Sequence, residues 1–148
     1  WDHPEQTLPN MDLDSVVQEF QKTDDELVKA CGQAATVCRA PYGAITEEQM
    51  SAVGKPFFMW STDSLDWKLM DADADYNEIM NDSGLGDGSI ILMHDIHETT
   101  VESCATIVPE LINRGYELVT IHTLAAANGV DLAAGETYYG FHGGTTNE

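Results

Sequence analysis

Two ionisable residues, His94 and Asp95, directly follow the apolar run Ile90–Met93, which makes them the first candidates for chemistry in this chain. An imidazole exchanges protons near neutral pH, so His94 suits general acid or base catalysis. A carboxylate such as that of Asp66 would hold the second ring nitrogen and stabilise the protonated ring. That arrangement suits an acid that protonates a leaving group. The alternative is a structural histidine that caps a strand and bonds to the backbone.

Two further residues add to this group. Arg39 lies in a rigid Arg-Ala-Pro-Tyr turn, from which its guanidinium could pin a carboxylate through two parallel hydrogen bonds. Trp67 offers a flat apolar surface, and sugars favour such surfaces because their C–H faces pack on aromatic rings. Together with His94, these residues predict an acid–base site with an apolar wall.

An alternation of helices and strands would position these residues. Helices are expected where apolar residues recur at helical spacing, and strands where short apolar runs lie between turn signals. The expected helices span Leu13–Cys31, Thr46–Val53, Ala72–Asn81, Val101–Arg114 and Thr123–Asn128, and the expected strands span Ala35–Arg39, Phe57–Ser61, Ser89–Asp95 and Tyr116–Ile121. This alternation is typical of an α/β fold with a parallel sheet or barrel, in which chemistry collects at the carboxyl ends of the strands. We expect a single domain over residues 1–148, with a Gly-rich extended tail from about 130 to 148.

The composition excludes several classes of partner. The 26 acidic residues against 6 basic ones give a formal net charge of −20, and no basic cluster is present, so nucleic acid is not an expected partner. No apolar run approaches the ~20 residues of a membrane span, and no signal peptide is visible. The three cysteines have no Cys-x-x-Cys spacing, and we expect at least two of them to be buried thiols, with one disulfide pair in an exported protein as the alternative.

Four short motifs, in order along the chain, resemble those of the NodB-homology polysaccharide deacetylases, carbohydrate esterase family 4. The motifs are Trp1-Asp2-His3-Pro4, Arg39-Ala40-Pro41-Tyr42-Gly43, Asp63-Ser64-Leu65-Asp66-Trp67 and Leu92-Met93-His94-Asp95. The resemblance extends to about Leu124. It implies a distorted (β/α) barrel of the polysaccharide deacetylase type, a bound divalent metal, and hydrolysis of acetyl groups on a glycan.

The resemblance implies a catalytic role for four residues. His94 would be the general acid, and Asp66 the carboxylate that tunes it. Arg39 would orient the catalytic base. The backbone N–H of Tyr42 would donate a hydrogen bond to the oxyanion.

The same resemblance implies substrate and metal contacts. Trp67 would form a wall of the pocket, Leu92 the apolar floor under the acetyl methyl group, and Pro41 a further substrate contact. His3 would be a metal ligand. The expected metal is zinc, with cobalt or nickel as alternatives, and it would polarise the acetyl carbonyl and activate a bound water.

The chain departs from the family pattern at its start. The family's first motif, Thr-Phe-Asp-Asp, which supplies the catalytic base and a metal-binding aspartate, is absent from the sequence, as is the first histidine of the motif that includes His3. We therefore expect the chain to be the C-terminal three-quarters of a catalytic domain. Its N-terminal strands would be missing, and activity would require an N-terminal segment of the same barrel as a partner.

The leading hypothesis is a metal-dependent deacetylase that acts on N-acetylglucosamine in peptidoglycan, because the loop Asp63–Lys68 looks most like that of the peptidoglycan members. Such an enzyme would be extracellular or associated with the bacterial cell envelope, and its partner would be an acetylated glycan. An acetylxylan esterase and a chitin oligosaccharide deacetylase are alternatives. A non-catalytic glycan-binding module that lacks the complete metal triad is a second alternative. An unrelated α/β hydrolase is disfavoured, because there is no Gly-x-Ser-x-Gly motif.

Overall fold

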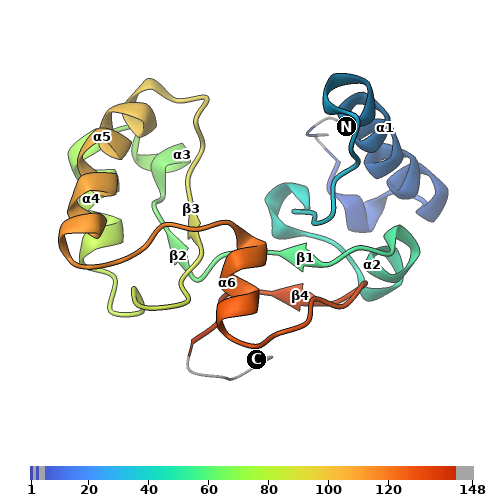
Figure 1. Cartoon of the computed structure of the whole chain (residues 1–148). Coiled ribbons are helices and arrows are strands. Elements are labelled where there is room, and N and C mark those ends of the chain that lie inside the picture. The colour runs from blue at the N-terminus through green and yellow to red at the C-terminus, as the bar shows by residue number, and fades with distance from the viewer. Residues whose placement is uncertain (2, 4–5, 143–148) are drawn as a thin grey trace. The chain divides into compact units, whose positions relative to one another are not determined.

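The structure, a computed structural model, describes residues 1, 3 and 6–142, which form two compact units (Figure 1). Unit 1 spans Trp1–Met59 and Leu132–Tyr138, and unit 2 spans Trp60–Asp131 and Tyr139–Glu148. Each unit is described by itself, and the expectation of a single domain stays a prediction. Within the described ranges, no helix is long and apolar enough to cross a membrane.

Two helices of unit 1 begin and end at the expected residues. Helix α1 (Leu13–Cys31) begins after Asp12, whose side chain caps the first turn, and ends at Gly32 in the left-handed conformation. Helix α2 (Glu47–Val53) begins at a capping box formed by Thr46 and the glutamine three residues later. Both starts follow from the need to satisfy the first N–H groups of a helix, so local sequence was sufficient to predict them.

A two-stranded parallel sheet of β1 (Phe57–Phe58) and β4 (Thr137–Tyr138) lies in the core of unit 1. The expectation of a tail from about residue 130 to 148 stays a prediction, and its described part contains β4, an extended segment that pairs with β1. The expected strand Ala35–Arg39 is reduced to one bridge, from Cys38 to Phe57. Short 3-10 turns lie at Leu8–Asn10 (η1) and Pro41–Gly43 (η2).

Unit 2 contains a second parallel pair, β2 (Thr62–Asp63) and β3 (Ile91–Leu92), with Thr62 opposite Ile91. The expected strand at Phe57–Ser61 is shorter than predicted, because β1 ends at Phe58. Beyond it, Ser61 donates its N–H to the carbonyl of Ile90, the residue directly before β3. Four helices accompany the pair: α3 (Asp66–Leu69), α4 (Ala72–Met80), α5 (Glu98–Asn113) and α6 (Ile121–Ala127). The expected strand at Ser89–Asp95 is in the right place but contains only the two residues of β3.

The core of unit 2 lies between α4 and α5. Ile79 and Met80 from α4 pack with Ile107 and Leu111 from α5, and all four are buried. Helix α5 continues through Pro109. Because α5 begins shortly after His94, this packing fixes the chain on both sides of the residues that the sequence singled out.

The expected strand at Tyr116–Ile121 was wrong. Thr120 accepts the N–H of Thr123 and starts α6 at Ile121, so the end of the segment is helical. Leu118 is 50% exposed and Val119 is 39% exposed. A strand-forming composition does not make a strand without a neighbour that supplies backbone partners, and the described residues supply none here.

Gly88 lies in the loop that leads into β3, where it contacts the segment around Phe141. A side chain at this position would meet the carbonyl oxygen of Phe141, because a Cβ would lie 2.2 Å from it, and the φ angle of 89° also favours glycine. Phe141 donates its N–H to the carbonyl of Gly88 at 2.9 Å. The segment around Phe141 is therefore attached to the loop that leads into β3.

The expectation for the cysteines was right about free thiols and wrong about the burial of two of them. Cys38 is buried, Cys104 is partly buried and Cys31 is exposed at the end of α1, and all three are free thiols. Burial raises the pKa of the Cys38 thiol to about 11. Cys38 is therefore uncharged at neutral pH and contributes to packing as a small apolar group.

Candidate active site

A tight turn before α3 carries Asp66 into the interior of unit 2. Leu65 has a φ of 55°, in the left-handed region, and its N–H donates to Oδ1 of Asp63 at 2.9 Å. The turn follows directly after β2, and α3 begins at the next residue. As a result, Asp66 is fully buried at the first position of a helix, where backbone N–H groups favour an acidic side chain.

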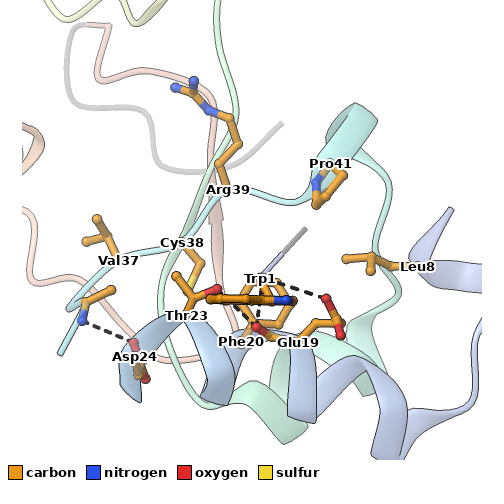
Figure 2. A pocket seen from close by; sticks show the side chains of 11 residues that line it. Trp1, Leu8, Glu19, Phe20, Thr23, Asp24, Val37, Cys38, Arg39 and Pro41 are labelled. Carbon is orange, nitrogen blue, oxygen red and sulfur yellow. Dashed lines mark hydrogen bonds and ion pairs between the residues drawn. The ribbon is translucent and has the colours of Figure 1, made fainter. Parts of the chain in front are cut away.

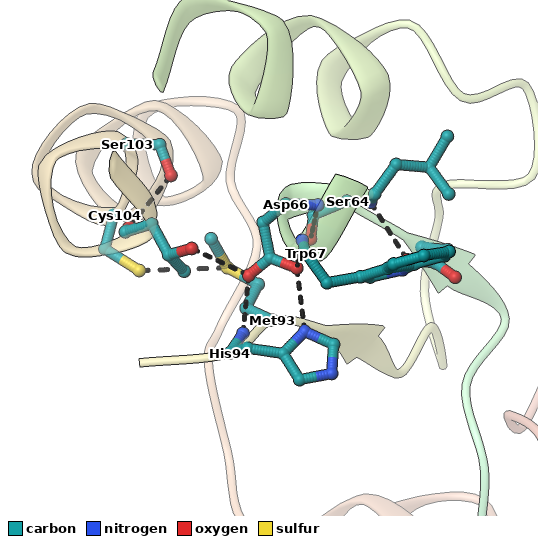
Figure 3. A network of polar contacts seen from close by, with 10 residues as sticks. Ser64, Asp66, Trp67, Met93, His94, Ser103 and Cys104 are labelled. Atoms are coloured by element: carbon teal, nitrogen blue, oxygen red, sulfur yellow. Dashed lines mark hydrogen bonds and ion pairs between the residues drawn. The ribbon is translucent and has the colours of Figure 1, made fainter. Parts of the chain in front are cut away.

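The carboxylate of Asp66 has four hydrogen-bond contacts, and Figure 3 shows those from His94 and Trp67. Nδ1 of the His94 ring lies 2.7 Å from Oδ1, and the backbone N–H of Trp67 donates to the same oxygen at 2.8 Å. The backbone N–H of His94 donates to Oδ2 at 2.5 Å, and the hydroxyl of Thr100 donates to it at 2.8 Å. Asp66 thus joins the turn before α3, the end of β3 and the first turn of α5.

These contacts decide the charge of Asp66. Burial alone would raise the pKa of its carboxyl group, but the hydrogen bonds from His94, Thr100 and Trp67 outweigh burial and lower the pKa below the ordinary 3.8. Asp66 is therefore ionised at neutral pH and can only accept hydrogen bonds. It follows that the proton of the shared contact belongs to Nδ1 of His94.

His94 is held so that its second nitrogen is available. Figure 3 shows Nε2 directed away from Asp66. The His94 side chain is 35% exposed, whereas Asp66 is not exposed at all. The ring of His97 lies 6.4 Å away between centroids. An imidazole with one nitrogen fixed by a carboxylate and the other open to solvent can exchange a proton with a bound molecule.

The remaining predicted residues of unit 2 lie next to this pair in the chain. Trp67 follows Asp66 and is 51% exposed, so its indole can contact a ligand. Leu92 is the last residue of β3 and is only 6% exposed, as expected of an apolar floor. Asp95 is exposed in the turn after His94.

The other predicted residues belong to unit 1. The rings of His3 and Tyr42 pack edge to face, with centroids 4.3 Å apart. Tyr42 has a φ of 59° inside η2, where Gly43 and Ala44 donate the turn hydrogen bonds. A non-glycine residue with this φ is strained, and such residues cluster at functional sites.

A cavity of about 200 Å³ also lies in unit 1, between α1 and the segment 35–41 (Figure 2). Arg39 and Pro41 contribute to its lining, and Figure 2 shows the guanidinium of Arg39 directed away from Glu19 and Asp24. Arg39 Nε donates weakly to the carbonyl of Phe58, at 3.4 Å. The roles assigned to Arg39, Pro41 and Tyr42 stay predictions.

The described residues do not provide a complete metal site. Among residues 1, 3 and 6–142, no three His, Cys, Asp or Glu side chains are grouped so that they could hold a metal ion. His3 is exposed and contacts Tyr42, and its neighbours Asp2 and Pro4 lie outside the described residues. The residues at hand therefore do not fit a bound metal by themselves.

Sequence reasoning missed Thr100, which completes the hydrogen bonding of Asp66. It is 1% exposed, and Ser103, which donates to its carbonyl at 2.9 Å, is 2% exposed. A signal was present, because Thr100 and Ser103 share the buried face of α5 with Ile107 and Leu111. A hydroxyl on an apolar face needs a partner, and here Asp66 is that partner.

Comparison with known proteins identifies the family. No family model matches the chain. The peptidoglycan-N-acetylglucosamine deacetylase PgdA of Listeria monocytogenes is 36% identical over 139 residues, which cover 94% of this chain and 28% of that protein. A solved structure described as T48 deacetylase with substrate superposes with a TM-score of 0.85 at 33% identity, covering 93% of this chain and 66% of the other. The chain belongs to the polysaccharide deacetylases, carbohydrate esterase family 4.

A second family 4 structure, an acetyl xylan esterase of Clostridium thermocellum in complex with a cobalt ion, has a TM-score of 0.84 at 26% identity over 96% of this chain and 70% of that one. The α/β fold of the deacetylase type is thereby confirmed. Family 4 is metal-dependent. This polysaccharide deacetylase chain spans about a quarter of the length of PgdA and about two thirds of the solved structures.

Proposed function

We propose that the protein containing this chain hydrolyses the N-acetyl group of N-acetylglucosamine in peptidoglycan. The observation that carries the proposal is the contact between Nδ1 of His94 and the buried, ionised Asp66, which directs Nε2 away from Asp66 on a side chain that is 35% exposed. The likeness to PgdA supports peptidoglycan as the substrate class. An enzyme with this substrate acts outside the cell membrane, so we place it in the cell envelope or outside the cell.

In this proposal His94 is the general acid. Protonated at both nitrogens, its ring donates the Nε2 proton to the sugar nitrogen as the bond between that nitrogen and the acetyl carbon breaks. Asp66 stabilises the imidazolium through the Nδ1–H bond and holds the ring in one orientation. After transfer the ring is neutral, and Nδ1 still carries the proton that faces Asp66.

Further residues would orient the substrate or assist the reaction. The exposed indole of Trp67 would pack against a sugar ring, and buried Leu92 would face the acetyl methyl group. Pro41 and the backbone N–H of Tyr42 would contact the substrate, the latter as a donor to the developing oxyanion. Arg39 would orient a catalytic base that is not among the described residues.

We further propose zinc as the metal, because histidine nitrogen is a preferred zinc ligand, and His3 as one of its ligands. The described residues offer no complete set of ligands, so we derive no catalytic step through the metal. The same observation favours a second candidate function, a glycan-binding module without catalysis. The number of zinc ions bound per chain in the purified protein distinguishes the two.

Acetate release from matched substrates tests the proposal. We expect release from peptidoglycan and little from acetylxylan. Release from acetylxylan alone would support an ester-cleaving enzyme, and release from chitin oligosaccharides alone would support a chitin oligosaccharide deacetylase. Glycan binding without acetate release from any substrate, in protein that binds no zinc when zinc is supplied, would support the binding module.

A further inference from the structure

A second buried carboxylate, that of Asp75, lies in unit 2 and has no place in the proposed reaction. Asp75 is in the first turn of α4, on the face of the helix that is buried. It is fully buried, as is Ile79 one turn later, while Asp73 and Glu78 of the same helix are exposed. A carboxylate thus occupies a position of α4 that its periodicity assigns to the core.

The carboxylate of Asp75 has no hydrogen-bond partner among the described residues. Both of its oxygens are buried and accept no hydrogen bond. Asp66 shows the opposite situation, with four donors around an equally buried group. A buried carboxylate without donors resists ionisation, because nothing replaces the water that it loses.

The two carboxylates share one interior. Helix α4 packs against α3, which begins with Asp66, and against α5, which supplies Thr100. The groups that interact electrostatically with Asp75 are Asp66 of α3, Asp71 at the start of α4, and His97 and Cys104 of the segment that forms α5. Asp63 of β2 instead lines an open surface hollow with Asn77 and Glu78.

The environments of the two carboxylates move their pKa values apart. Burial raises the pKa of Asp75 above 3.8, the negative charges of Asp66 and Asp71 raise it further, and His97 opposes the shift. Asp66 has a lowered pKa. A pair of acids separated in this way ionises in sequence, Asp66 first and Asp75 later.

We propose that Asp75 is a positioning residue for the Asp66–His94 pair, because its carboxylate, once ionised, adds a second buried negative charge to the interior that holds Asp66 and so stabilises the protonated ring of His94. A negative charge in a poorly solvated interior acts over a longer distance than one at the surface. Electrostatic coupling of this kind does not require catalysis. Its consequence for catalysis, an acid that keeps its proton to higher pH, rests on the proposed function.

Titration by NMR tests the coupling in both directions. In Asp75→Asn, the pH at which the His94 ring loses its proton should fall by about half a unit or more, because one negative charge is lost. In Asp66→Asn, the ionisation of Asp75 should move to lower pH, because a like charge is removed. An unchanged His94 titration in the first variant, or an unchanged Asp75 titration in the second, would overturn the proposal.

Asp73→Asn is the matched control, because it removes one exposed charge from the same helix and should leave His94 unchanged within about 0.1 unit. Asp75→Ile, also uncharged, should shift the His94 titration as Asp75→Asn does; a shift in only one of them would show a packing effect and would refute the electrostatic role.

If His94 is coupled to Asp75 but the protein releases no acetate, the proposed function fails and this inference stands. In active protein, Asp75→Asn should move the alkaline limb of kcat to lower pH by the same amount.

Discussion

Asp66 contacts both the side chain and the backbone of His94, with Nδ1 of the ring 2.7 Å from Oδ1 and the backbone N–H 2.5 Å from Oδ2. One buried carboxylate thereby fixes the rotation of the ring and the position of the chain that carries it. These two hydrogen bonds determine which tautomer the His94 ring adopts and in which direction its Nε2 points.

Replacing the proposed acid should abolish most turnover. For His94→Ala we expect kcat to fall by about 10²–10⁴-fold, the usual contribution of a general acid. The zinc content should change little, because His94 is not an expected ligand. His122→Ala is the control, since that histidine is exposed on α6 and has no role in the proposed mechanism. Full activity of His94→Ala on an acetylated glycan would refute the assignment.

Stability should depend on the charge of Asp66. Its folded pKa is lower than the ordinary 3.8, so the unfolded chain binds more protons at acidic pH. The stabilisation is complete above the unfolded pKa and is lost as the pH falls below 3.8 and through the lowered folded value. Urea unfolding at a series of pH values should show this loss in the wild type.

Asp66→Asn should lack that acid-dependent loss and should be less stable at neutral pH by about 2 kcal/mol, because the amide cannot accept from all four donors. Asp73→Asn provides the control, since that side chain is exposed on α4. A variant Asp66→Asn with the same acid dependence as the wild type would assign the effect to other carboxylates of this acidic chain.

The sequence predicted the local features of the fold well and the pairing of its strands poorly. The bounds of α1 and the start of α2 follow from caps such as Asp12, Thr46 and Gly32, which act within one turn. Strand pairing depends on distant segments. Neither the assignment of Thr137 to β4 nor the absence of a strand at Leu118 could be read from local composition.

The same distinction applies to the site. The motifs placed Asp66 and His94 near the ends of neighbouring strands, and the structure brings them into contact. Thr100 and Asp75 were missed, because the role of a buried polar residue depends on what it faces across a helix interface. A polar residue at a core position of an amphipathic helix was the available signal, and it applies to both.

Thr100 should hold Asp66 in its ionised form. For Thr100→Val, which keeps the shape but removes the donor at 2.8 Å, we expect the pKa of Asp66 to rise and the free energy of unfolding to fall by about 1–2 kcal/mol. NMR titration of the Asp66 carboxyl group and urea unfolding measure the two effects. Ser103→Ala is the matched control, because its hydroxyl donates to the carbonyl of Thr100 and does not touch Asp66. An unchanged pKa of Asp66 would show that the other three donors suffice.

Trp67 should act on substrate binding and leave the fold intact. Its side chain is 51% exposed, and only its backbone N–H bonds to Asp66, so truncation preserves that contact. For Trp67→Ala we expect KM to rise about three- to tenfold, as the loss of an aromatic stacking contact predicts, with kcat reduced by less than that. Met70→Ala is the control, since Met70 is 50% exposed just beyond the end of the same helix. A loss confined to kcat, or to stability, would place Trp67 in positioning Asp66 and remove it from the substrate-binding surface.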